Sequence, residues 1–279
     1  DGMNNQLDPL IELQKEFCLF KLDSKVRVGL LKEINLMKAG HQIDEISMYN
    51  KEDGKLLMKR FLETLSVAPV PKTLIEDFMN NPNSIAYDRI AFTPKITPKE
   101  TLNYWIPPNI TPVQGSYTLI KSFLFEVICN GDLNIFEYLL DFLAHMIQKP
   151  EEKPGVMFVM LGGEGIGKGT FFYLLQKIWS KTTLIVSDID HVIGGYNAAL
   201  EKNYIVCMDE ALFKGQKKAM DSLKSFITET TITIEQKYQP RRSLESIHRF
   251  FAATNHEHFG NIELDSRRFV FLDVSNKFQ

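Results

Sequence analysis

The chain has 279 residues, of which 44% are hydrophobic and 24% are charged, enough to bury a substantial core in about two domains. Its formal net charge of −3 excludes a protein that coats nucleic acid with its whole surface, so any such contact must come from a local basic patch. There is no signal-peptide pattern and no apolar run near 18 residues, which predicts no membrane contact, and three scattered cysteines predict buried, reduced thiols in a cytoplasmic protein.

Residues 1–112 are expected to form a small α+β region. The stretch FCLFKLDSKVRVGLL alternates as strands do, whereas KLLMKRFLETL has helical spacing. A Pro-rich segment from Pro94 to Pro112 ends the region. No motif in it indicates chemistry, so its role stays open.

Residues 113–150 are expected to be a helical segment. Apolar residues recur at helical spacing from Leu119 to Val127, and Asn130-Gly131 is expected to end that helix. Asp132 can cap a second helix, whose apolar stripe ends near Met146. Such stripes indicate core packing rather than a cofactor site. The polar segment EEKPG, 151–155, then marks a domain boundary.

Residues 151–279 alternate between strand, loop and helix. We expect strands at 156–161, 183–187, 204–208, 249–254 and 268–274. Because these runs are almost continuously apolar, they predict a five-stranded parallel sheet covered by helices on both faces.

A glycine-rich loop, GGEGIGKGT, follows the first of these strands and precedes a helix. Glycine lets backbone N–H groups point inward and come close to a phosphate chain, and the helix contributes its positive end. Lys168 adds a point charge. The pattern predicts an ATP-binding phosphate loop; its expected ligand-binding residues are Gly162, Gly163, Gly165, Gly167, Lys168, Gly169 and Thr170.

The loop departs from the usual pattern at one position. The residue after the lysine is normally Ser or Thr, whose hydroxyl binds Mg²⁺, but here it is Gly169, with Thr170 one step later. Either Thr170 or a water molecule is expected to take that metal contact. The sequence GKGT also occurs in nucleotide kinases, so the loop alone leaves two functions open.

Paired acids follow the predicted buried strand YIVCM. Asp209 and Glu210 lie 41 and 42 residues after Lys168. Beside a triphosphate, the first carboxylate is expected to hold Mg²⁺ and the second to polarise the attacking water. This spacing favours a nucleotide hydrolase.

Two further signals flank later strands. Asn255 follows the strand RFFAAT, and its amide can hydrogen-bond both the attacking water and the γ-phosphate, since parallel strands end at one edge of a sheet. Arg267 and Arg268 precede the last strand. A guanidinium placed at the γ-phosphate of a neighbouring subunit would stabilise transition-state charge, so activity would require an oligomer.

The segment TITIEQKYQPRRSLESIHR, 231–249, alternates as a strand through Gln236, turns around Tyr238 to Pro240 and alternates again toward His248, which predicts a hairpin. Residues 214–249 hold eight Lys or Arg against four Asp or Glu, so a basic patch exists despite the acidic total. Such a hairpin suits binding of single-stranded DNA. The expected contacts are Lys237, Tyr238, Arg241 and Arg242.

One cluster is a decoy. His256-Glu257-His258 resembles a metal site, but it lacks the HExxH spacing and an apparent third ligand. We expect no metal there.

The order of these motifs resembles that of superfamily 3 helicases, and more narrowly the helicase part of viral and phage primase-helicases. The likeness runs from about Leu102 to Ser275. It covers LNYW, AHMIQKPEEKPG, GGEGIGKGTF, GYNAAL, YIVCMDEALF, LKSFITETTITIEQK, FAATN and DSRRFVFLDVS.

The resemblance implies an α/β, AAA+-like P-loop ATPase core in residues 151–279, working as a ring, usually a hexamer, around one DNA strand. It makes Asp209 and Glu210 the Walker B acids, Asn255 the polar sensor, Lys237 a channel-facing lysine and Arg267 or Arg268 the arginine finger. The host-cell or virus-infected cytoplasm and an upstream primase domain or partner are expected. A nucleotide kinase and a non-unwinding DNA-dependent ATPase remain the alternatives.

Overall fold

The computed structural model describes residues 7–41, 43, 45–209, 217–237, 239, 241–255 and 267–279, without the side chains of 217–220. The chain divides into two compact units, residues 1–91 with 96–104, and residues 92–95 with 105–279. The helical segment therefore shares a unit with the glycine-rich loop. Among the described residues, no helix has both the length and the apolar character needed to cross a membrane.

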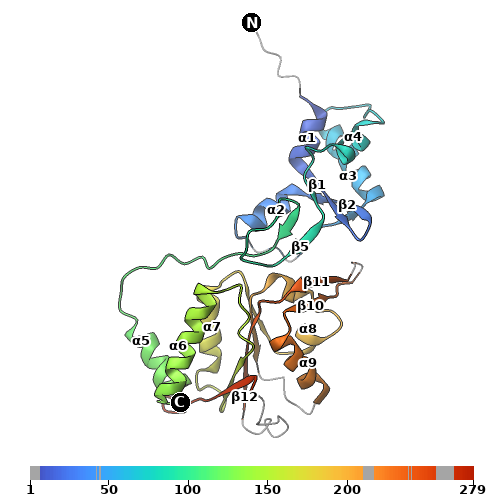
Figure 1. Ribbon diagram of the computed structural model, residues 1–279. Helices are drawn as coiled ribbons and strands as arrows, with labels where there is room; N and C mark the ends of the chain where they lie inside the picture. The colour runs from blue at the N-terminus through green and yellow to red at the C-terminus, as the bar shows by residue number, and fades with distance from the viewer. Residues whose placement is uncertain are drawn as a thin grey trace. The chain divides into compact units, whose positions relative to one another are not determined.

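The first unit is an α+β fold, as expected (Figure 1). Its helices are α1 (Pro9–Glu16), α2 (Leu31–Lys38), α3 (Lys51–Thr64) and α4 (Leu74–Asn80). One sheet has the order β3 (Tyr49–Asn50), β2 (Lys25–Leu30), β1 (Phe17–Leu22), β4 (Ala86–Tyr87), and a second pairs β5 (Arg89–Ala91) with β6 (Thr101–Asn103). The predicted alternation corresponds to the antiparallel β1–β2 hairpin, whose turn residues Asp23 and Ser24 both have positive φ.

The helical segment begins with α5 (Thr118–Ser122) and continues as a π-helix, η1 (Phe123–Ile128). The predicted end at Asn130-Gly131 is confirmed, since both residues have positive φ. The expected helix is present, and its second half has π-type hydrogen bonding, which the spacing of apolar residues such as Leu124 and Val127 does not distinguish from that of an α-helix. The side chain of Asp132 accepts a bond from the Ile135 amide at 3.1 Å and caps α6 (Leu133–Gln148), as predicted.

The sheet of the second unit has five parallel strands, as the sequence predicted. Its order is β13 (Phe269–Asp273), β7 (Met157–Leu161), β12 (Arg249–Thr254), β9 (Ile205–Asp209), β8 (Thr183–Val186). Each strand lies within one residue of its expected bounds at either end. Strand β12, which is buried along its whole length, therefore lies between β7, which leads into the glycine-rich loop, and β9, which ends at Asp209.

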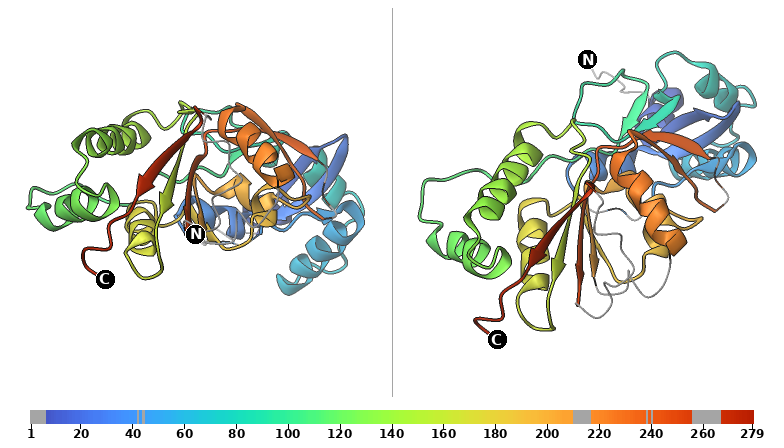
Figure 2. Two further views of the ribbon diagram at one scale, coloured as in Figure 1. Left: turned by 90° about the horizontal axis from the view of Figure 1, so that it is seen from below. Right: turned by 60° about the horizontal axis from the view of Figure 1, so that its bottom comes forward.

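Helices cover both faces of this sheet (Figures 1 and 2). Helix α6 and α7 (Lys168–Ile178) lie on one face, and α8 (Asp190–Ile193) and α9 (Lys217–Thr228) lie on the other. On the first face, neighbouring Phe158 and Phe251 stack, Phe142 of α6 meets Phe158 edge-on at 4.8 Å, and Phe171 of α7 meets Phe251. This aromatic core fixes the helix that begins at Lys168 against the central strands.

Beside the sheet, a 3₁₀-helix η2 (Ala198–Lys202) precedes β9, and an antiparallel hairpin joins β10 (Thr231–Ile234) to β11 (Arg242–Glu245). The three cysteines, Cys18, Cys129 and Cys207, are free and buried, as expected. Burial raises the pKa of Cys18 and of Cys129 to about 12 and raises that of Cys207 well above its ordinary value.

Candidate nucleotide site and DNA-facing hairpin

The loop between β7 and α7 has a backbone that only glycine supplies at two positions. Gly162 has φ 153°, and a Cβ there would lie 2.3 Å from Cδ1 of Ile166. Gly167, which begins α7, has φ 112°, and a Cβ there would press on the Phe123 ring at 3.2 Å. The loop therefore packs closely on the π-helix, and any larger residue at either position would be strained.

Lys168 lies inside the curve of this loop. Its side chain is 6% exposed, and its Nζ donates to the carbonyl oxygen of Gly162 at 2.7 Å and to that of Gly163. The ammonium group is thus held at the start of α7 by the loop's own backbone. An incoming phosphate could take over these bonds, because an anion binds an ammonium more strongly than a neutral carbonyl does.

Strand register brings three predicted residues to one edge of the sheet. Leu161, directly before the loop, pairs with Thr254, and Asp209 pairs with Ala253. The amide of Gly162 also donates to the Thr254 oxygen at 3.1 Å. Lys168, Asp209 and Asn255 therefore share the carboxyl edge of three neighbouring strands, where ligands bind in open α/β sheets.

Electrostatics distinguish these residues from ordinary surface groups. Burial raises the pKa of Asp209, and the opposing influence is the positive charge of Lys168. Oδ1 of Asn255 is buried, and no hydrogen-bond partner is found for it among the residues that the structure describes. Since buried polar atoms are almost always satisfied, this oxygen is suited to a bond with a water or a ligand.

Gly169 and Thr170, where the sequence predicts a metal contact, lie in the first turn of α7. A Cβ at Gly169 would meet no described atom within 4 Å, and Thr170 is exposed in the first turn of α7. Space therefore exists at Gly169 where other phosphate loops carry a hydroxyl. Whether Thr170 or water ligates Mg²⁺ stays a prediction.

Arg267 and Arg268 lie at the opposite edge of the sheet. The amide of Met157, at the start of β7, donates to the Arg268 oxygen at 2.8 Å. Arg268 thus precedes the strand whose far end, Asp273, pairs with Leu161 beside the loop. Five strand residues span about 17 Å, which exceeds the reach of an arginine side chain. Neither guanidinium can serve the loop of its own chain.

The hairpin is held at its base by two residues that precede β9. The side chain of Asn197 donates to the Thr233 oxygen at 3.0 Å and accepts from the Glu235 amide at 2.9 Å. Glu201, 2% exposed, forms a two-point ion pair with the guanidinium of Arg242. Strand β10 ends at Ile234, two residues before the predicted end at Gln236, because Asn197 takes the next amide.

The three expected DNA contacts that the structure describes differ in their surroundings. Lys237 is exposed and its Nζ lies 5.3 Å from the centre of the exposed Tyr196 ring. Arg241 is exposed and pairs with Glu235 at 3.1 Å. Arg242 differs from the expected DNA contact, because its guanidinium pairs with Glu201 at the base of the hairpin and its side chain is 14% exposed. Of the expected contacts that the structure describes, Lys237 and Arg241 are the exposed cations.

Some expected residues lie outside the described part of the chain. These are Glu210, Tyr238 and the decoy His256-Glu257-His258. Among the described residues, no group of three or more His, Cys, Asp or Glu could hold a metal ion.

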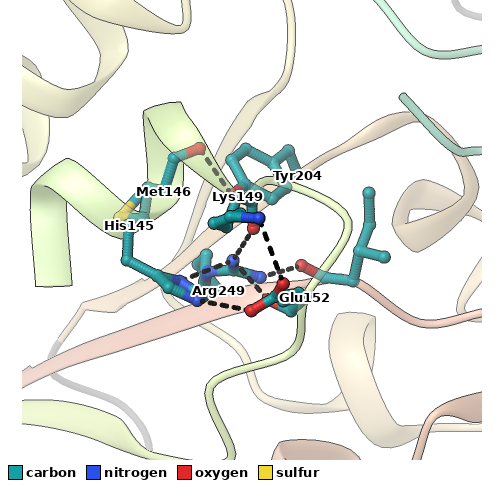
Figure 3. Close-up of polar contacts among 7 residues, drawn as sticks. His145, Met146, Lys149, Glu152, Tyr204 and Arg249 are labelled. Atoms are coloured by element: carbon teal, nitrogen blue, oxygen red, sulfur yellow. Dashed lines mark hydrogen bonds and ion pairs between the residues drawn. The ribbon is translucent and has the colours of Figure 1, made fainter. Parts of the chain in front are cut away.

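Sequence reasoning missed a polar cluster around Arg249, which Figure 3 shows. This fully buried guanidinium donates to the backbone oxygens of Ile247 and Glu152, each at 2.6 Å, and of Lys149 at 3.2 Å. It also lies over the Tyr204 ring, 5.1 Å from its centre. A charge at the start of a strand predicted to be wholly buried was the available signal, because a buried charge needs partners.

The fold and the site define the class of this protein as an α/β protein with a five-stranded parallel sheet and a glycine-rich loop at the carboxyl edge of that sheet. A model of a family of unknown function, DUF5906, matches residues 160–268, which include the glycine-rich loop, Asp209 and Asn255.

The chain is similar to the DNA primase-polymerase of Nitratiruptor phage NrS-1, with 27% identity over 164 residues, 54% of this chain and 22% of the relative. Two structures of the NrS-1 C-terminal region share the fold, with TM-scores of 0.68 and 0.67 at 20% identity. They match 98% and 97% of this chain and 63% and 62% of their own lengths. The matched part of the chain thus spans about a fifth of the length of the curated relative. The expected resemblance to a phage primase-type protein is confirmed.

Proposed function

We propose that this chain is the motor part of an ATP-dependent DNA helicase that works in phage-type DNA replication. The observation that carries the proposal is the convergence of Lys168, Asp209 and Asn255 at one edge of the sheet. A buried lysine in a glycine loop, an acid whose charge is disfavoured by burial, and an amide oxygen in need of a partner suit a triphosphate with its metal and attacking water.

The residues fit ATP and Mg²⁺. The loop glycines and the start of α7 would bind the phosphates, Lys168 would neutralise the outer ones, and Asp209, with Thr170 or water, would hold the metal. When bound, Mg²⁺ would neutralise charge that develops on the phosphate oxygens. Asn255 would orient the attacking water, and the expected role of Glu210 is to accept its proton as the bond between the γ-phosphate and ADP breaks.

The basic hairpin supports DNA as the partner. Its base is fixed to the segment before β9 by Asn197 and Glu201, whereas Lys237 and Arg241 stay exposed toward its tip. A braced ribbon that presents cations is suited to tracking a DNA backbone. A nucleotide kinase would have no use for it.

Assembly and context complete the proposal. Because Arg267 and Arg268 lie too far from Lys168 of the same chain, either one would act on a neighbour's nucleotide in a ring, for which we propose a homo-hexamer. The phage relative supports the cytoplasm of an infected cell as the place of action, and a primase domain or partner acting alongside.

The test is phosphate release with and without single-stranded DNA, followed by strand displacement. We expect hydrolysis that DNA stimulates, together with unwinding. Hydrolysis that ignores DNA, with phosphate transferred to a nucleoside monophosphate, would identify a kinase. DNA-stimulated hydrolysis without strand displacement would identify a non-unwinding ATPase.

The Lys237→Ala variant tests the hairpin. We expect it to retain basal hydrolysis, to bind single-stranded DNA more weakly and to lower the slope of log affinity against log salt by about 0.7, because one phosphate contact is lost. The exposed Lys177 of α7 supplies the control, Lys177→Ala, which should match the wild type. Unchanged DNA affinity and salt slope in Lys237→Ala would contradict the hairpin's role.

A further inference from the structure

Lys153 is a lysine of the junction between α6 and β7 whose ammonium group is surrounded by acceptors. Its Nζ donates to the backbone oxygens of Phe226 at 2.5 Å and Glu229 at 2.7 Å, and to Oγ of Ser246 at 2.5 Å. It also lies 5.7 Å from the centre of the Phe250 ring. The three N–H groups of a charged lysine are therefore all used.

These acceptors are the two roots of the basic hairpin. Phe226 lies in the last turn of α9, Glu229 directly follows that helix, and β10 begins at Thr231. Ser246 follows the last residue of β11 directly, and its amide donates to the Thr230 oxygen at 2.8 Å. One ammonium group thus joins the start and the end of the hairpin.

The hydrogen bonds from Lys153 continue through Ser246 and His248 to η2, which precedes the strand that carries Asp209. Oγ of Ser246 lies 2.9 Å from Nδ1 of His248, and Nε2 of His248 lies 2.6 Å from the Leu200 oxygen in η2. A carbonyl can only accept, so Nε2 carries the proton and Nδ1 accepts from the Ser246 hydroxyl. Ser246 must in turn accept from Lys153. The whole relay therefore runs in one direction, from the ammonium group of Lys153 to the Leu200 oxygen.

The other side of Lys153 is anchored to the nucleotide-binding core. Arg249 holds the oxygens of Lys149 and Glu152, the residues that lead to Lys153 (Figure 3). Four residues after Lys153, β7 begins and runs into the glycine-rich loop. Arg249 also starts β12, which ends beside Asn255. The junction is therefore attached to both strands that flank the proposed γ-phosphate position.

We propose that Lys153 is the positioning residue through which the nucleotide site and the DNA-binding hairpin sense one another. The inference rests on the proposed function. Lys153 touches neither nucleotide nor DNA; it would act by keeping the hairpin roots fixed to a junction that moves with β7 and β12. Without it, hydrolysis and DNA binding would persist separately.

The charge of Lys153 makes the coupling depend on pH. Burial, and then the positive charge of Arg249, lower the pKa of Lys153 to about 7, and Glu229 opposes them. His248 faces the same relay, and burial lowers its pKa to about 4, so it stays neutral. As pH rises through 7, Lys153 loses one of three donors, and the brace should weaken.

The experiment compares Lys153→Met, Lys153→Arg and a control, Lys149→Met. Lys149 belongs to the same junction, but its side chain is exposed, and its ammonium group lies 3.7 Å from the Glu152 carboxylate. The first measurement is hydrogen exchange of the hairpin amides with and without an ATP analogue. The second is hydrolysis with and without single-stranded DNA from pH 6 to 8.5.

In Lys153→Met, we expect hairpin exchange to be about tenfold faster, the effect of the ATP analogue on the hairpin to vanish, and stimulation by DNA to fall about tenfold, with basal hydrolysis retained. Stimulation of the wild type should decline above pH 7, whereas that of Lys153→Arg should not, because arginine keeps its charge. Lys149→Met should match the wild type.

Unchanged hydrogen exchange of the hairpin amides in Lys153→Met would show that Lys153 does not hold the hairpin in place. Faster exchange with a normal response to the ATP analogue and to DNA would reduce Lys153 to a structural role and overturn the coupling. A wild type that hydrolyses no ATP, or that ignores DNA, would instead refute the proposed function, while the exchange measurements would still decide whether Lys153 links the two sites.

Discussion

Asp209 ends β9 and Asn255 directly follows the neighbouring strand β12, so both lie at the same edge of the sheet. Burial disfavours the charge of Asp209, and Oδ1 of Asn255 has no partner among the described residues. Both arrangements cost stability and both are suited to a charged, hydrated ligand. Residues that are retained for function rather than for stability commonly lower the stability of the folded protein in this way.

A first prediction follows for Asp209→Asn. The pKa of Asp209 is higher in the folded protein than in the unfolded chain, so the folded protein holds this proton more strongly. The carboxylate therefore has no effect on stability below its ordinary pKa, and it destabilises the fold as pH rises through the folded pKa. At pH 7 we expect this substitution to raise the melting temperature without nucleotide, while hydrolysis falls at least about 10²-fold.

Thermal unfolding and phosphate release measure the two effects. The exposed Asp141 of α6 supplies the control, Asp141→Asn, which should change neither. A lower melting temperature for Asp209→Asn would show that the carboxylate stabilises the fold, contrary to this account.

At the residue scale, the placement of Lys168, Asp209 and Asn255 was predictable because parallel strands end together. Asp209 ends β9, Asn255 follows β12, and Lys168 begins the helix that the loop after β7 leads into. The sequence did not predict the roles of Glu201, Arg242 or Lys153. Their partners lie 41 or more residues away, and no local pattern says which buried acid meets which base.

Among the elements, the hairpin depends most on distant contacts. Its strands are short, and its base is held by Asn197, Glu201 and the relay through His248. The five sheet strands were predictable because each is a continuous apolar run. The hairpin's shorter extent and the π-helix were not, since both follow from which amide meets which acceptor.

The relay gives a second prediction, for acid unfolding. The ordinary pKa of His248 is about 6.5 and its folded pKa is about 4, so a proton binds the unfolded chain first as pH falls. The free energy of unfolding is fully retained above 6.5 and should fall by about 3 kcal/mol between 6.5 and 4 on account of this group alone.

Urea unfolding at several pH values measures that loss. His248→Gln should be less stable at pH 7 but should lose about 3 kcal/mol less between the two pH values. The exposed His191 supplies the control, His191→Gln, which should lose as much as the wild type. Parallel pH curves for wild type and His248→Gln would contradict the neutral, buried histidine.

For the whole molecule, strand direction decides where the arginines can act. Because β13 runs parallel to β7, the residues before it lie at the edge away from the glycine-rich loop. The sequence predicted this separation once the strands were taken as parallel. It could not predict that the chain divides near residue 104, because that depends on contacts between segments distant in sequence.

The third prediction is complementation between two inactive variants. Arg267→Ala or Arg268→Ala should lower hydrolysis by roughly 10³–10⁵, and Lys168→Ala should also be inactive. If the arginine acts on the nucleotide of a neighbouring subunit, mixed rings contain some subunit interfaces at which both the lysine and the arginine are intact. An equal mixture should recover about a quarter of wild-type hydrolysis.

The mixture must be reassembled from dissociated subunits, with each variant reassembled alone as its control. An arginine that served its own chain would give no recovery, since every subunit would carry one defect. Normal hydrolysis by both single arginine variants would remove the finger altogether.

The buried cysteines have a practical consequence for labelling this protein. Thiolate, not thiol, reacts with maleimides, and all three native thiols are shielded and hard to ionise. A single cysteine introduced at an exposed position, such as Lys237→Cys, would therefore be the one readily alkylated group in the folded chain. A fluorophore could be attached there with the native cysteines left in place.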